Sequence, residues 1–161
     1  RRGYFVEGLG AAQFGSPGAV DRLRAGTPGD KPVAFALAAT DPANPYGAAL
    51  GWPASSGSTA DEAATGHRPG RKAGAIVVLV DGELVLYVER GGRTLLTWSE
   101  DPDLLTPAAE ALSATVRRGG LGQLTVEKAD GAALLGNGGP LRDALAAAGF
   151  VATPRGLRVR A

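Results

Sequence analysis

The strongest constraint on the fold is the run GAIVVLVDGELVLYVERGGRTLLTW at residues 74–98. Apolar segments rich in β-branched residues are separated there by Asp81-Gly82 and Gly91-Gly92, dipeptides that suit two-residue hairpin turns. The run therefore predicts a three-stranded antiparallel meander. Its strands are apolar on both faces, whereas an exposed sheet has one polar face, so we expect them to be covered on both sides or wrapped into a barrel.

The rest of the chain reads as short helices and short strands. Helical patterns with proline starts or capping residues cover residues 14–26, 107–118 and 139–150. With the meander, they predict an α+β fold in which a mostly antiparallel sheet is curled into a β-barrel-like module with about three short helices. At 161 residues, the chain fits one domain spanning residues 1–161.

Composition excludes several kinds of chemistry. Cysteine is absent, which excludes disulfides, thiolate catalysis and Cys-ligated metals, and His67 has no second histidine to complete a zinc site. We therefore predict no metal site. No apolar run approaches the roughly 18 residues that span a bilayer and no signal peptide is recognisable, so we expect a cytoplasmic protein without a membrane partner.

The chain also lacks the phosphate-binding loop of ATPases, so no cofactor is expected within it. Because residue 1 is Arg rather than Met, we expect the chain to be part of a longer protein. The formal net charge of +1 does not demand a nucleic-acid partner. Residues 154–160 nevertheless carry three arginines, Arg155, Arg158 and Arg160, and no acid.

The segment TDPANPYGAALGWP at residues 40–53 predicts a rigid bend, since its three prolines fix the backbone. Asp41 is the candidate catalytic acid there; the alternative is an Asx turn, in which its carboxylate binds backbone N–H groups. Tyr46 and Trp52 are candidate platforms for stacked bases. Equally, these two aromatic side chains could plug one end of a barrel.

Residues 54–72 hold almost no large apolar side chains and predict a flexible loop within the domain. The loop ends in Arg68, Arg71 and Lys72. Mobile basic residues of this kind gain affinity for nucleic acid by releasing counterions, so the three are candidate phosphate contacts. A solvated loop without a partner is the alternative.

Three colinear blocks, at residues 1–24, 38–53 and 68–98, resemble the C-terminal part of the large helicase-related (Lhr) proteins of actinobacteria. The first reads RRGYFVEGLGAAQFGSPGAVDRLR and the third RPGRKAGAIVVLVDGELVLYVERGGRTLLTW. The resemblance implies an ATP-dependent, 3′-to-5′ superfamily 2 DNA helicase that acts in DNA repair. ATP and Mg²⁺ would bind its distant ATPase domains, and this chain would be the barrel that follows its winged-helix domains.

Three functions follow from this resemblance. The first is an accessory domain that binds single-stranded or tailed duplex DNA. The second is a scaffold that assembles the parent helicase into oligomers. The third is part of a DNA glycosylase site that removes uracil, with Asp41 as the acid and Tyr46 and Trp52 as stacking walls.

Overall fold

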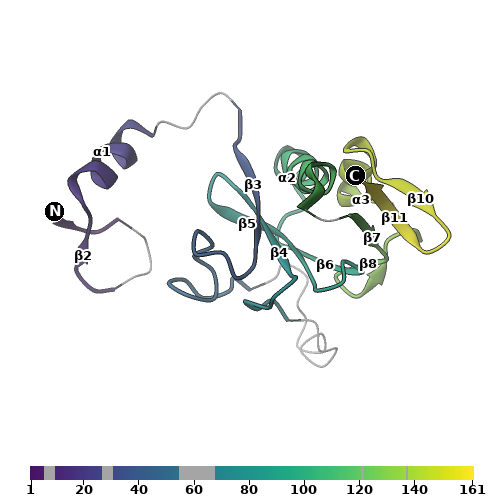
Figure 1. The fold of residues 1–161 in the computed structure, drawn as a ribbon, viewed down its shortest axis with the longest axis horizontal. Coiled ribbons are helices and arrows are strands. Elements are labelled where there is room, and N and C mark those ends of the chain that lie inside the picture. The colour runs from purple at the N-terminus through teal and green to yellow at the C-terminus, as the bar shows by residue number, and fades with distance from the viewer. Residues whose placement is uncertain (6–9, 27–30, 55–67, 121, 137) are drawn as a thin grey trace.

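A six-stranded sheet forms the centre of the molecule, and the predicted meander is its middle part. The computed structural model describes residues 1–5, 10–26, 31–54, 68–120, 122–136 and 138–161. Neighbouring strands are antiparallel except β6 and β8, which run parallel. Their order is β3 (Ala34–Ala38), β4 (Ile76–Val80), β5 (Glu83–Val88), β6 (Thr94–Thr97), β8 (Lys128–Ala129) and β9 (Ala132–Ala133) (Figure 1).

The turn between β4 and β5 has the predicted geometry. Asp81 and Gly82 have φ angles of 48° and 89°, as a type I′ turn requires. The connection between β5 and β6 is longer than the predicted two-residue turn. There the N–H of Glu89 donates to the carbonyl of Thr94 over 2.9 Å, which leaves residues 90–93 as the loop.

The predicted α+β class and mostly antiparallel pairing are confirmed, but the predicted barrel is wrong. Within the described part of the chain, the large sheet ends at β3 and at β9, which do not pair, and a second sheet stands separate from it. Both faces of β4 and β5 are buried because different elements cover them. The helix α2 (Pro102–Thr115) packs on the face that carries Val78, and Tyr46 and Trp52 pack on the face that carries Val77.

Three α-helices lie in the described part of the chain, as predicted: α1 (Pro17–Ala25), α2 and α3 (Pro140–Ala147). The helix α2 begins at Pro102, not at Pro107 as predicted. Its cap is Asp101, whose carboxylate accepts from the N–H of Asp103 over 2.9 Å. Pro107 therefore lies inside the helix. A π-helical turn, Val116–Gly120, follows α2.

The second sheet contains three antiparallel strands in the order β10 (Val151–Thr153), β11 (Gly156–Arg160) and β7 (Gln123–Val126). One face is buried: Leu124 and Val126 of β7, with Leu157 and Val159 of β11, belong to the same core as α2 and α3. This sheet lies at the end of the molecule farthest from α1 (Figure 1).

The N-terminal elements stand apart from this core. A two-stranded ribbon of β1 (Arg2–Gly3) and β2 (Gln13–Phe14) precedes α1, and Val20 is the one buried apolar residue among the described residues before Ala39. Figure 1 shows α1 and β2 at one end of the molecule, away from the large sheet. No helix in the described ranges is long and apolar enough to cross a membrane.

Candidate functional site

The bend at residues 40–53 is organised around the buried side chain of Asn44. That side chain is 1% exposed. Its Nδ2 donates to the carbonyl of Ala39 over 2.9 Å, and its Oδ1 accepts from the N–H of Tyr46 over 3.1 Å. Asn44 thus satisfies a backbone carbonyl just before the bend and a backbone N–H inside it, where the prolines prevent regular pairing.

Arg71 holds the same bend from outside. Its Nη1 donates to the carbonyl of Asn44 over 2.7 Å, and its Nη2 donates to those of Thr40 and Asp41 over 3.1 and 3.0 Å. A longer contact of 3.4 Å joins Nη1 to the carbonyl of Tyr46. The guanidinium predicted to contact phosphate is therefore committed to four carbonyls, and this geometry favours a structural role.

Asp41 adopts the Asx turn that was the alternative to catalysis. Its Oδ1 accepts from the N–H of Ala43 over 2.8 Å, while its backbone carbonyl accepts from Arg71. The carboxylate is thereby used to turn the chain at the start of the bend.

Tyr46 and Trp52 are stacked on each other and fixed to the sheet. Their ring centroids lie 6.3 Å apart at an interplanar angle of 26°. Trp52 meets Tyr87 edge to face at 5.7 Å, and the hydroxyl of Tyr46 donates to the carbonyl of Gly82 over 3.2 Å. Both rings are half-buried against the core cluster that contains Val77. Packing of this kind favours the reading in which they cap a core rather than stack on bases.

The described end of the 54–72 loop is tied to the sheet. The hydroxyl of Tyr87 donates to the carbonyl of Gly70 over 3.0 Å. Burial raises the pKa of this hydroxyl above its ordinary value of 10.0; the bond to Gly70 opposes that rise and the charge of Glu89 adds to it. The Nζ of Lys72 donates to the carbonyl of Arg68 over 3.0 Å, and both basic side chains are exposed. Residues 55–67, with His67, lie outside the described residues.

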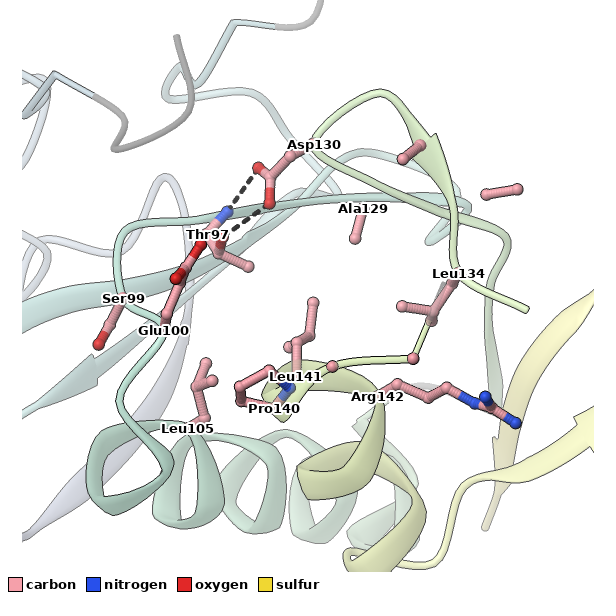
Figure 2. Close-up of a pocket in the computed structure, with 14 residues that line it drawn as sticks. Thr97, Ser99, Glu100, Leu105, Ala129, Asp130, Leu134, Pro140, Leu141 and Arg142 are labelled. Atoms are coloured by element: carbon pink, nitrogen blue, oxygen red, sulfur yellow. Dashed lines mark hydrogen bonds between the residues drawn. The ribbon is translucent and has the colours of Figure 1, made fainter. Parts of the chain in front are cut away.

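A cavity of about 320 Å³ lies at the end of β6, beside the β8–β9 hairpin and the start of α3 (Figure 2). Figure 2 shows Asp130 and Glu100 on one side of it and Arg142 on the other. Asp130 binds Thr97 with both carboxylate oxygens: Oδ1 accepts from the N–H over 2.9 Å and Oδ2 from the hydroxyl over 2.6 Å. The walls between these groups are apolar, formed mainly by Leu105, Ala129, Leu134, Pro140 and Leu141.

Sequence reasoning did not single out this cavity. The ADGA tetrapeptide at residues 129–132 does signal a hairpin turn, in which Asp130 and Gly131 have φ angles of 47° and 80°. Nothing in the sequence places that turn beside Thr97 and α3. Within the described ranges, no three His, Cys, Asp or Glu residues gather as a metal site would require.

A third feature is a surface rich in arginine at the second sheet. Residues 117–126 and 149–161 contain Arg117, Arg118, Arg155, Arg158 and Arg160 and no acidic residue. The first two lie in the π-helical turn after α2, which contacts β11, and the last two lie on β11 itself. The acid-free run at 154–160 was the sequence signal for this surface.

Comparison with known proteins identifies the family. The chain is 51% identical to the Lhr helicase/probable uracil glycosylase of Mycolicibacterium smegmatis over 170 residues, which covers 99% of the chain. It is 37% identical to the Lhr helicase/uracil glycosylase of Escherichia coli K12 over 161 residues, which covers 97% of the chain. The chain belongs to the large helicase-related (Lhr) family.

The Lhr match refines the description of the chain. The chain spans about a tenth of the length of each relative: 11% of the M. smegmatis protein and 10% of the E. coli protein. The family model for a winged-helix domain of large helicase-related proteins matches residues 1–34. Those residues include β1, β2 and α1, the elements that stand apart from the core.

Proposed function

We propose that this chain is an accessory nucleic-acid-binding module of an Lhr helicase that acts on DNA during repair. ATP hydrolysis with Mg²⁺ and 3′-to-5′ movement would be carried out elsewhere in such a helicase, because the chain has no phosphate-binding loop. The partners would be DNA and the neighbouring winged-helix domains of the same polypeptide. A contribution to oligomer assembly is the alternative role.

The segregation of charge carries this proposal. The formal net charge is only +1, yet the arginines of residues 117–126 and 149–161 have no acidic residue among them. Clustered positive charge attracts the phosphate backbone even where net charge is small, and it supplies most of the non-specific affinity of such proteins.

Salt dependence is the first test of this function. Fluorescence anisotropy of labelled DNA titrated with the chain should show that affinity falls steeply as salt rises. The slope of log affinity against log salt should steepen by about 0.9 for each duplex phosphate neutralised. Light scattering of the same samples would report assembly. If no binding is detected at low salt while the chain associates with itself, DNA binding is contradicted and the assembly role is favoured.

Removal of uracil is a second candidate function, and the cavity beside α3 is the observation that favours it. Both relatives carry uracil glycosylase in their names. The cavity of about 320 Å³ falls in the usual range of ligand pockets, roughly 300–1,000 Å³, and combines apolar walls with carboxylates. Both carboxylate oxygens of Asp130 accept hydrogen bonds from Thr97. Glu100 is therefore the carboxylate that we propose to stabilise the developing sugar cation.

Excision of uracil by the longer Lhr protein that contains this chain tests the second function. Glu100→Gln should lower the rate at least about 100-fold, as loss of a catalytic carboxylate does. Asp41→Asn should leave the rate unchanged, because Asp41 serves an Asx turn and does not line the cavity. An unchanged rate in Glu100→Gln would remove the cavity from consideration, and a loss confined to Asp41→Asn would return catalysis to the bend.

A further inference from the structure

We propose that the outer face of the β10-β11-β7 sheet is a docking surface for duplex nucleic acid, held through phosphates and without regard to sequence. This inference rests on the proposed function and names the surface and the form of nucleic acid. Neither the winged-helix match at residues 1–34 nor the names of the relatives assigns a role to these strands.

Strand alternation gives the sheet two different faces. Leu157 and Val159 of β11 are buried in the core, so Arg158 and Arg160 stand on the opposite face. Two residues on one face of a strand are roughly 7 Å apart along it. The pairing register sets Thr125 and Val151 beside Arg158, and Gln123 beside Arg160. The outer face therefore carries basic and small or neutral side chains.

The charge of this face is unbalanced. A solvated sheet face is common in antiparallel sheets and needs no partner. Cross-strand neighbours on such faces are often opposite charges, whereas the residues directly opposite Arg158 and Arg160 are neutral. The acid that follows β7, Glu127, forms an ion pair of 3.7 Å with Arg93. Arg155 extends the same positive charge into the β10–β11 turn, where it is exposed. Charge complementarity therefore indicates a polyanion.

Not every arginine nearby is available for such a partner. The Nη2 of Arg117 donates to the carbonyl of Ala148 over 3.2 Å, which ties the turn after α2 to the end of α3. We therefore assign Arg117 a structural role rather than a role in binding. Arg155, Arg158 and Arg160 are the three that we assign to the docking surface.

The side chains of this face favour a duplex over a single strand. Proteins that bind single strands without sequence preference add aromatic platforms to a basic groove, so that bases stack on them. The residues paired across this face, Gln123, Thr125, Val151, Arg158 and Arg160, include no aromatic. A duplex also presents one charge per ~1.7 Å of axis, about twice the density of one strand. Contacts to phosphates alone carry no sequence information.

The test compares anisotropy titrations of the chain with a duplex and with a single strand of the same length and sequence. The wild-type chain should bind the duplex more tightly. Replacing Arg155, Arg158 and Arg160 together by Ala should lower the slope of log affinity against log salt on the duplex by about 2.7, at about 0.9 for each contact.

A matched control is K31A/R90A/K128A, which removes the same charge from exposed positions outside this sheet. It should change the slope of log affinity against log salt by no more than about 0.9, the value for one phosphate contact. Because Arg158 is half-buried, the single variants R158Q and R160A supplement the triple variant if it fails to fold. Each should lower the slope by about 0.9, with an unchanged melting curve.

The outcomes separate this inference from the proposed function. Binding to the duplex that the triple and single variants leave unchanged would overturn the docking surface and leave nucleic-acid binding standing. Tighter binding to the single strand, lost in the triple variant, would overturn the choice of a duplex. No binding by the wild-type chain at low salt would overturn both the inference and the function.

Discussion

Replacing Arg71 by Ala should lower the free energy of unfolding by about 2–4 kcal/mol and release the bend at residues 40–53. Hydrogen bonds from charged donors contribute about 1.5–3 kcal/mol each. Three of the four bonds that Arg71 makes to the bend are 3.1 Å or shorter. Water can replace part of them, because Arg71 is only half-buried, so the loss should be smaller than their sum.

The geometry of Arg71 also predicts that Lys is a poor substitute. The two terminal nitrogens reach different pairs of carbonyls, those of Asn44 and Tyr46 on one side and of Thr40 and Asp41 on the other. A lysine ammonium is a point charge without this planar fork, so Arg71→Lys should recover less than half of the loss.

Urea unfolding followed by tryptophan fluorescence would measure both changes, because Trp52 lies within the bend. Lys72→Ala is the control: among the described residues its ammonium makes one exposed bond, to the carbonyl of Arg68, so the change should stay within about 0.5 kcal/mol. Equal midpoints for Arg71→Ala and wild type would show that the bend holds without its guanidinium.

How much of the fold the sequence predicts depends on whether the signal is local. The Asp81-Gly82 turn and the meander around it were predictable, because turn chemistry and strand patterning act within a few residues. The barrel was not. Strands apolar on both faces are equally consistent with a closed sheet and with an open sheet covered by two elements, and the covers here, α2 and the bend, come from elsewhere in the chain.

At the candidate site, too, the sequence predicts only features that depend on neighbouring residues. The sequence marks Arg71 only as a basic residue at the end of a polar loop, because its acceptors lie about 30 residues away and only the folded backbone aligns them. The cavity beside α3 joins Thr97, Asp130 and Leu141 from three separate segments. By contrast, the arginine surface was partly visible as a run without acids, since alternation along one strand is a local property.

Gly156→Ala should destabilise the protein by about 3 kcal/mol, at the upper end of the usual cost of overpacking. Gly156 begins β11 and is buried. A Cβ there would overlap the carbonyl of Val126 and crowd the Cα of Glu127. Those neighbours are backbone atoms at the end of β7, so they cannot move aside as a flexible side chain could, and relief requires β11 to shift against β7.

Gly122→Ala is the matched control, because a Cβ at Gly122, just before β7, meets nothing within 4 Å. Thermal unfolding should place Gly122→Ala within a degree or two of wild type and Gly156→Ala well below it. Coincident melting curves would show that β7 and β11 are not in the close backbone contact described.

Because the register of β11 also sets Arg158 and Arg160 on one face, Gly156→Ala should weaken duplex binding even where the protein remains folded, while Gly122→Ala should not.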